Sequence, residues 1–483
     1  MFDCILVWYK RTNFCVYHDW GMFVSEWMTI LPPLLAVVVV LWKKEVILAL
    51  LVAIFCSELL LILGSEGLQP ALTEFSIASV ERVIGVFGSP DNTRILTFSM
   101  LVGALLGFMR YSGGVTATVE FLIKKGISGT ARRARMLPFL TGIAIFIESN
   151  LSVLMSGIIS RGLFDKFNMS RARLAYIIDS TSAPICILIL MNGWGAYVLG
   201  LVSSYELEQS AVSTLIQTIP LNFYALITIG IVLYTIIADK THGPMKEAEA
   251  NPKKALETTD IEIEASKPRF MLIPLFTMSV SMVGFMFWTG NGSFTDGSGS
   301  RSVLYATALA ALVAYVMMIT SGRFSHKKMT EISFKGMNEL LPLVVIVLFS
   351  LALGASLKEL GTGKFIAGIV AGNIPLFLIP ALIFVAGGLM SFSTGTSWGT
   401  FALLIPIGMP LVVELGLPAP LILSAILGGG IFGDHCSPIS DTTAVSAVAS
   451  GCDLLEHVKT QLPYALTAGG LTVVFYIIAG LVM

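Results

Sequence analysis

The sequence has few charged residues. Asp, Glu, Lys and Arg make up 13% of its 483 residues, about half the share that soluble domains carry. Hydrophobic residues account for 55% of the chain, and the mean hydropathy is +0.83. This composition excludes an ordinary soluble domain and predicts an integral membrane protein, whose first partner is the lipid bilayer.

Three further absences narrow the function. The net charge of −1 leaves no basic surplus for nucleic acid, so we expect no nucleic-acid partner. The six cysteines are scattered without a CxxC pair, which predicts neither a disulfide framework nor a zinc site. A short apolar stretch precedes Lys10 and Arg11, the reverse of the order in a signal peptide, so residues 1–28 are expected to form an uncleaved N-terminal tail.

Apolar stretches of the length that crosses a bilayer occur in both halves of the chain. We expect spans near residues 23–42, 45–64, 94–111, 219–238, 270–289, 302–320, 338–357 and 463–483. Residues 239–269 contain 13 charged side chains in 31 positions and are predicted to form a solvated cytoplasmic linker. Residues 65–92 are too polar to span, and we expect a helix there that lies along the outer surface.

Four other apolar stretches contain polar interruptions. Residues 136–163 and 374–413 each carry a polar cluster at mid-length, and we predict hairpins there. Residues 174–200 and 419–450 each contain an Asp followed by Ser and Pro. Because proline removes a backbone donor and disfavours helical geometry before it, these two stretches are predicted to be broken helices.

Basic residues lie on both sides of the first hairpin. Lys124, Lys125, Arg132, Arg133 and Arg135 precede it, and Arg161, Lys166, Arg171 and Arg173 follow it. The positive-inside rule places both flanks in the cytoplasm, so the hairpin is expected to be re-entrant. Each half then contains three spans, a hairpin, a broken helix and a closing span.

This order predicts an all-α polytopic membrane protein with inverted-topology repeats at residues 29–238 and 270–483. Secondary transporters have this architecture, with substrate sites near the midplane where discontinuous helices meet. The alternative is a bundle of ordinary spans joined by polar helix contacts.

Placing a charged Asp at the centre of a membrane helix costs about 2.5 to 3.5 kcal/mol. We therefore expect the acidic residues inside these apolar stretches to have a function or an interaction that offsets this cost. Asp179 and Asp434 lie at equivalent places in the two broken helices. Unwound carbonyls, hydroxyls and a carboxylate suit a hard cation, and the carboxylate can exchange that cation for a proton. Helix capping is the structural alternative for these acids, and bonding to the residue's own helix is the alternative for any single Ser or Thr.

The candidate ion- or substrate-binding residues come from the two hairpins and the two breaks. They are Glu148, Ser149, Asn150, Asp179, Ser180, Thr181, Ser182, Thr394, Thr396, Ser397, Asp434, Ser437, Asp441 and Thr442. Glu148 and His435 are the candidate proton relays.

One enzyme signal competes with transport. Residues 395–399 match the G-x-S-x-G pattern of serine hydrolases, and His435 could serve as a base for Ser397. That motif requires a strand, a sharp turn and a helix in a soluble sheet, which this apolar context does not offer. A non-enzymatic transporter is therefore favoured. A channel fits less well, since paired inverted hairpins indicate alternating access.

Three segments resemble the NhaC family of sodium/proton antiporters. They are FGDHCSPISDTT at 432–443, TGTSWGT at 394–400 and YIIDSTSAP at 176–184. The likeness extends from about Thr29 to the C-terminus, apart from the linker. It implies the ion transporter superfamily fold, with two re-entrant hairpins, in a homodimer whose transport domain moves against a scaffold.

The resemblance also implies the ligands. Sodium and protons would be the coupled ions, with lithium or potassium as alternatives to sodium and with no cofactor, and the protein would lie in the cell inner membrane as a multi-pass antiporter. Asp179, Asp434 and Asp441 look like the family's sodium ligands. Relatives include malate/lactate exchangers and amino-acid carriers, so a coupled carrier of a small organic acid or amino acid is the alternative. Arg110, Arg161 and Arg173 fall at segment ends, which leaves no obvious buried clamp for a carboxylate and favours an inorganic cation.

Overall fold

The structure is a computed structural model that describes residues 26–114, 116–117, 130–146, 148–190, 192–252, 266–293 and 297–482. The first half contains α2 (Leu31–Lys43), α3 (Val46–Ser65), α4 (Leu68–Gly85), α5 (Pro90–Tyr111), α7 (Ala131–Ala144), α8 (Ser149–Lys166), α9 (Arg171–Ser180), α10 (Ala183–Leu188), α11 (Gly193–Val202), α12 (Ala211–Gln217), α13 (Phe223–Ile237) and α14 (Pro244–Ala250). The second half contains α15 (Arg269–Thr289), α16 (Gly299–Thr320), α17 (His326–Glu359), α18 (Thr362–Asn373), α19 (Ile379–Thr394), α20 (Ser397–Leu415), α21 (Ala419–Cys436), α22 (Asp441–Ser450) and α23 (Leu454–Val482). Short 3₁₀ turns occupy Glu26–Ile30, Val86–Gly88 and Leu376–Leu378.

Ten helices in the described part of the chain are long and apolar enough to cross a bilayer. A further bent unit, Arg171–Leu188 with Gly193–Val202, passes the same test as a pair. The chain is therefore an all-helical, multi-pass membrane protein, as the composition predicts. Two helices begin earlier than the predicted spans, since α17 begins at His326 and α23 begins at Leu454.

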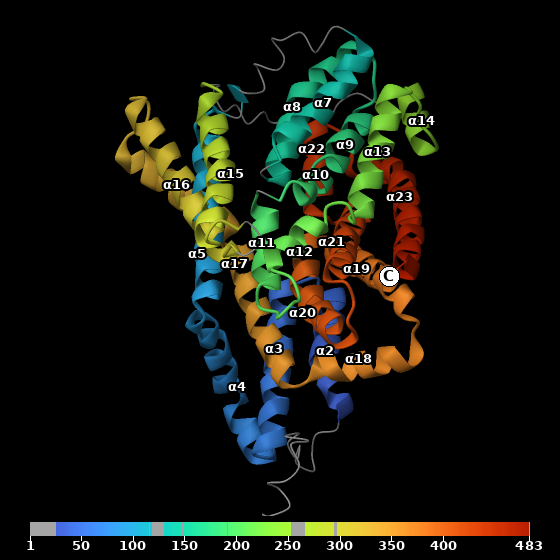
Figure 1. Cartoon of the computed structure of the whole chain (residues 1–483). Coiled ribbons are helices and arrows are strands. Elements are labelled where there is room, and N and C mark those ends of the chain that lie inside the picture. Colours follow the sequence, from blue (N-terminus) through green and yellow to red (C-terminus); the bar gives the residue numbers. More distant parts are fainter. Residues whose placement is uncertain are drawn as a thin grey trace, which may run out of the picture.

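Helices α5 and α17 form the centre of one group of helices, with α15 and α16 packed beside α5 (Figure 1). The crossing of α5 and α17 is close because glycines face each other there. A Cβ atom on Gly103 would lie 2.6 Å from the carbonyl oxygen of Gly336, a distance that no side chain tolerates. We call α5, α15, α16 and α17 the scaffold group.

Helix α4 lies within residues 65–92, and it packs against α3 and α17. Arg82 of α4 forms ion pairs of 2.7 Å with both Glu58 of α3 and Glu359 of α17. Glu58 is almost fully buried and also accepts a hydrogen bond of 2.7 Å from Ser356. This network fixes α4 against two neighbouring helices.

A second group of helices lies on the side away from α16 (Figure 1). It contains α7, α8, α9, α13, α22 and α23. Helix α8 packs on α22, and α19 packs along α21. The second hairpin turns at Gly395, whose φ of 70° is left-handed, and a Cβ atom there would lie 2.5 Å from the carbonyl oxygen of Ile439. Glycine therefore lets the hairpin tip contact the break between α21 and α22.

The linker differs from the predicted solvated loop. Its residues 244–250 form α14, which contacts α9 and α23, while residues 253–265 lie outside the described part, as do the tail residues 1–25 and Lys124 and Lys125. Asp239 pairs with Arg135 of α7 and Arg173 of α9. Its partial burial opposes ionisation, but these two guanidinium groups outweigh that effect and hold the pKa of Asp239 below its usual value.

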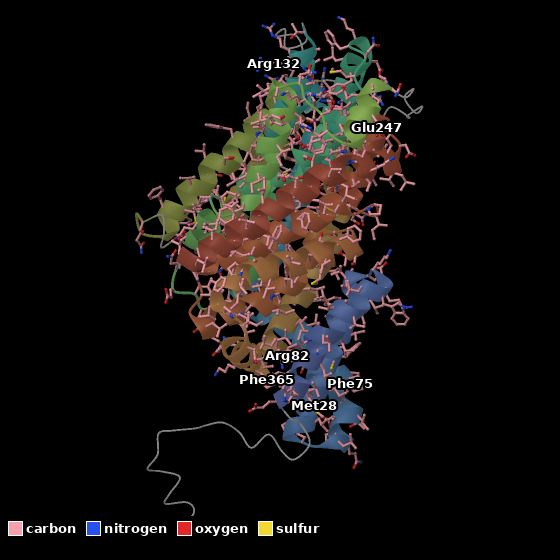
Figure 2. The ribbon with its side chains drawn as sticks, turned by 90° about the vertical axis from the view of Figure 1, so that its right-hand side faces the viewer. Met28, Phe75, Arg82, Arg132, Glu247 and Phe365 are labelled. Carbon is pink, nitrogen blue, oxygen red and sulfur yellow. The ribbon has the colours of Figure 1, made fainter. Side chains whose placement is uncertain are left out.

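These ion pairs place the start of α7, the start of α9 and the linker at one end of the molecule. Figure 2 shows Arg132 and Glu247 at this end, far from Arg82 and Met28 at the other end. Arg173 corrects one expectation, because it is buried rather than peripheral. Its charge is already matched by Asp239 and Glu249, so it does not offer a clamp for a carboxylate.

Candidate ion-binding site

The structure brings the two predicted breaks together. Helix α9 ends at Ser180 and α10 begins at Ala183, while α21 ends at Cys436 and α22 begins at Asp441. Thr443 connects the breaks, because its Oγ1 lies 3.4 Å from Asp179 Oδ2 and 3.4 Å from the carbonyl oxygen of Asp434. Both Asp side chains are buried, with relative exposures of 0% and 1%.

Asp179 is held by two residues of α23. Gln461 Nε2 donates to Asp179 Oδ2 at 2.6 Å, and His457 Nε2 lies 3.2 Å from the same oxygen. Gln461 Nε2 also donates to the carbonyl oxygen of His435 at 2.9 Å. One amide group therefore ties the acid of the first break to the backbone beside the acid of the second.

Asp434 is held by the tip of the second hairpin and by its own break. Ser397 Oγ donates to Asp434 Oδ2 at 3.0 Å, and Ser440 Oγ donates to Oδ1 at 2.5 Å. Ser440 also caps α22 by accepting from the backbone N–H of Thr443. Ser437 Oγ donates to the carbonyl oxygen of Phe392 at 2.7 Å, so the break and the hairpin are joined at two points.

Several polar atoms around Asp179 lack a hydrogen-bond partner. Within the described residues these are Asp179 Oδ1, Gln461 Oε1, His435 Nε2 and His457 Nδ1. Buried polar atoms are normally satisfied by protein, water or a ligand. Two of the four are oxygens that can only accept, which is the kind of atom that a hard cation binds.

The three proposed sodium ligands do not form a three-acid cage. Among the described residues, no group of three Asp, Glu, His or Cys side chains has the geometry to hold a metal ion. Asp441 instead accepts from the backbone N–H of Thr442 at 2.9 Å, at the start of α22. A cation at Asp179 would therefore be held by a mixture of carboxylate, amide, hydroxyl and carbonyl oxygens.

Other predicted site residues bond locally. Thr181 Oγ1 donates to the carbonyl oxygen of Ile177, Ser182 Oγ to that of Asp179, and Thr394 Oγ1 to those of Ser391 and Thr396. These bonds match the alternative of hydroxyls satisfied by their own helix. Thr442 Oγ1 lies 3.1 Å from Ser440 Oγ. Ser180 lies beside Asp179 and Ser149 beside Glu148, and both are buried, while Thr396 precedes Ser397 at the start of α20.

The first hairpin packs against both breaks, since α8 packs on α22 and a Cβ atom on Gly142 of α7 would lie 2.9 Å from Thr181 Oγ1. Glu148 caps α8, where its carboxylate accepts from the backbone N–H groups of Asn150 and Leu151 at 2.9 and 2.6 Å. Glu148 and Asn150 also line two cavities beside Arg110 of α5. This tip therefore lies between α22 and the scaffold group.

The hydrolase hypothesis requires a pairing of Ser397 with His435. In the structure the Ser397 hydroxyl donates to Asp434, whereas His435 Nδ1 lies 3.1 Å from the Tyr224 hydroxyl. Neither contact activates a serine nucleophile.

Two residues of the site, His457 and Gln461, were missed by the sequence reasoning. They lie four positions apart on α23 and so share one helix face. The predicted last span began at residue 463, which left both residues in an assumed loop. The spacing of His and Gln on an extended amphipathic helix was the signal that could have found them.

The fold and the buried site together define a polytopic membrane transporter. Residues 185–481, more than half of the chain, match the family model described as the Na+/H+ antiporter family. The chain belongs to this family, which confirms the resemblance to NhaC-type antiporters. It is a family of transporters and not of enzymes.

One known protein is similar to this chain along most of its length, and another along a shorter segment. An uncharacterised protein of Haemophilus influenzae is 30% identical over 488 residues, covering 95% of this chain and 92% of that one. The malate-2H+/Na+-lactate antiporter of Bacillus subtilis is 40% identical over 106 residues, 22% of each chain. Among solved structures, the YdaH transporter of Alcanivorax borkumensis superposes with a TM-score of 0.57 at 13% identity, covering 86% of this chain and 89% of that one; this likeness concerns the fold alone.

Proposed function

We propose that the protein exchanges sodium for protons at the site where the two helix breaks meet. The observation that carries this proposal is the fully buried carboxylate of Asp179, which has an unpartnered oxygen at the junction of two interrupted helices. An ionised carboxylate inside a membrane protein needs a counter-charge. Either a sodium ion or a proton supplies it, and occupancy by one excludes the other.

Asp434 is the second proposed ligand-bearing acid. Its carboxylate already accepts two hydroxyl hydrogen bonds. Thr443 Oγ1 contacts both its backbone carbonyl oxygen and the carboxylate of Asp179. A change of ligand at Asp179 would therefore also affect the second break and the tip of the second hairpin. In this proposal Asp441, Glu148 and His435 lie on the route of the ions rather than around the bound cation.

The arrangement of the halves supports alternating access. Each half contributes a long scaffold helix, a hairpin and a broken helix in the same order, with α5, α7–α8 and α9–α11 matching α17, α19–α20 and α21–α22. We infer that the halves are inverted repeats, and that the interrupted helices move against the scaffold group. The proposed setting is a homodimer in the cell inner membrane, with sodium and protons as the only ligands of this site.

The test is sodium/proton exchange in reconstituted vesicles that contain a pH-sensitive dye. An imposed sodium gradient is expected to drive proton movement, and the apparent sodium affinity is expected to weaken as the pH falls, approaching about tenfold per pH unit for one shared proton. Asp179→Asn and Asp434→Asn should each abolish exchange, because an amide cannot trade a proton for a cation.

The matched control is Asp453→Asn. Asp453 is exposed and its carboxylate accepts from the backbone N–H of Glu456 at the start of α23. Because Asn is as good a helix cap as Asp, this variant should exchange normally. Sodium-dependent proton movement by Asp179→Asn at the rate of the control would refute the proposed site.

A further inference from the structure

Two adjoining cavities lie between the scaffold group and the first hairpin. Their volumes are about 330 and 200 Å³, and both are lined by Arg110, Glu148, Asn150 and Leu151. Glu339 of α17 lines the smaller one, and residues of α22 line the larger one. None of the four shared residues is a ligand of the bound cation in the sodium site proposed above, where Glu148 lies only on the route of the ions.

Arg110 is the cationic side chain on the scaffold side of both cavities, and Glu339 is an acidic one on the same side of the smaller cavity. Arg110 Nη1 lies 3.3 Å from Glu339 Oε2, while a guanidinium group has five N–H donors. That ion pair is long and its partners are partly exposed, so it contributes little stability. A planar guanidinium in such a position is suited to bind a carboxylate through two parallel hydrogen bonds.

The opposite wall has acceptors and a negative charge. Glu148 keeps further acceptor positions after its two backbone hydrogen bonds. The side-chain oxygen of Asn150 is buried without a hydrogen-bond partner within the described residues. Between the two walls the lining is apolar, with Leu106 and Leu340 in one cavity and Val448 in the other. A ligand that matches this lining has a carboxylate at one end, an ammonium at the other and an apolar side group.

We propose that these cavities bind a small zwitterionic amino acid, with its carboxylate on Arg110 and its ammonium group against Glu148 and the Asn150 side-chain oxygen. The proposal adds an organic ligand to the sodium-coupled antiporter and rests on that proposed function. The ligand lies between α5 and α17 on one side and α8 and α22 on the other. Its binding therefore couples the scaffold group to the hairpin that packs on the second break.

The test uses the purified full-length protein and thermal melting in detergent. Three probe mixtures are compared at equal concentration: the common L-amino acids, the matching carboxylic acids without the amine, and the matching amines without the carboxylate. The amino-acid mixture should raise the Tm, and each single-charge mixture should raise it less. Arg110→Gln should weaken the apparent affinity for the amino-acid mixture at least about tenfold, as expected for a lost charged hydrogen bond.

Two further variants define the geometry. Glu148→Ser removes the negative charge but keeps a good helix cap, and should also weaken amino-acid binding. Arg94→Gln is the matched control, because Arg94 lies on the same helix and pairs with Asp91 outside the cavities. It should bind the mixture as the unmodified protein does. The proposal is overturned if no mixture raises the Tm, if the carboxylic acids alone act as strongly as the amino acids, or if Arg110→Gln binds normally.

Vesicle measurements separate this proposal from the antiporter proposal. Sodium/proton exchange in solute-free vesicles, together with no amino-acid binding, would overturn the organic ligand and leave the antiporter intact. Amino-acid binding that depends on Arg110, without sodium/proton exchange under any gradient, would overturn the antiporter and leave the organic ligand standing.

Discussion

Replacing Gln461 with Leu removes a side chain that hydrogen-bonds both helix breaks. Gln461 Nε2 donates to the carboxylate of Asp179 and to the carbonyl oxygen of His435. Without this donor the charged form of Asp179 is less stabilised, so protons compete better against sodium. At a fixed pH the apparent sodium affinity should therefore fall.

The distances give the expected size of this effect. The bond from Gln461 to the Asp179 carboxylate is 2.6 Å long, and a hydrogen bond to a charged group is worth about 1.5 to 3 kcal/mol. That range corresponds to a roughly 10- to 100-fold loss of sodium affinity. Thr443 contacts the same oxygen at 3.4 Å, so Thr443→Val should lose about 0.5 to 1 kcal/mol, or roughly two- to fivefold.

The assay is the sodium dependence of dye-reported proton flux in vesicles at one pH. Gln217→Leu is the control, because Gln217 is an exposed amide on α12 that bonds only to polar neighbours on the surface among the residues described. It should have unchanged sodium affinity. An unchanged affinity in Gln461→Leu, or a larger loss in Thr443→Val than in Gln461→Leu, would refute this account of how the breaks are coupled.

Three further predictions concern stability, each measured by thermal melting in detergent. Gly395→Ala should destabilise the fold by about 1 kcal/mol more than Gly416→Ala, because both glycines are left-handed but only the former meets a backbone carbonyl within van der Waals distance; equal losses would show that the hairpin tip is not in close contact. Arg82→Gln should cost about 3 kcal/mol, since it leaves Glu58 buried without its ion-pair partner, and a loss below about 1 kcal/mol would contradict that pairing. Asp239→Asn should be destabilising at neutral pH, and the difference should vanish as the pH falls through the lowered pKa of Asp239, because a depressed pKa stabilises the fold only while the group is ionised; a difference that persists in acid would show that charge is not its cause.

The positions of the breaks and hairpins could be predicted because local chemistry decides them. Pro184 stands in the first turn of α10 and Pro438 lies between α21 and α22, so both coincide with predicted breaks, whereas Pro406 and Pro410 lie inside α20 without ending it. The left-handed turn of the second hairpin lies at Gly395, inside the polar cluster that the sequence marked. The linker was less predictable, since its charged residues form α14 and ion pairs with α7 and α9 instead of facing water throughout.

The neighbours of the acids could not be predicted in the same way. Asp179 and Gln461 are 282 positions apart and meet only when α9 and α23 pack together. Arg110 was placed at the end of a segment, which is correct along the chain, but the folding of the first hairpin against α5 makes it a lining residue of the cavities. Sequence position says nothing about such contacts.

The amino-acid sequence by itself determined that the chain lies in a membrane, where its helices break and which acids those breaks carry, because hydropathy and proline act on a few neighbouring residues at a time. Tertiary structure alone decided which hydroxyl, amide and imidazole groups surround each acid, and that Glu148 and Arg110 line the same cavities. Those choices depend on how helices distant along the chain pack, and packing is settled by the shapes of whole helix faces rather than by any single segment.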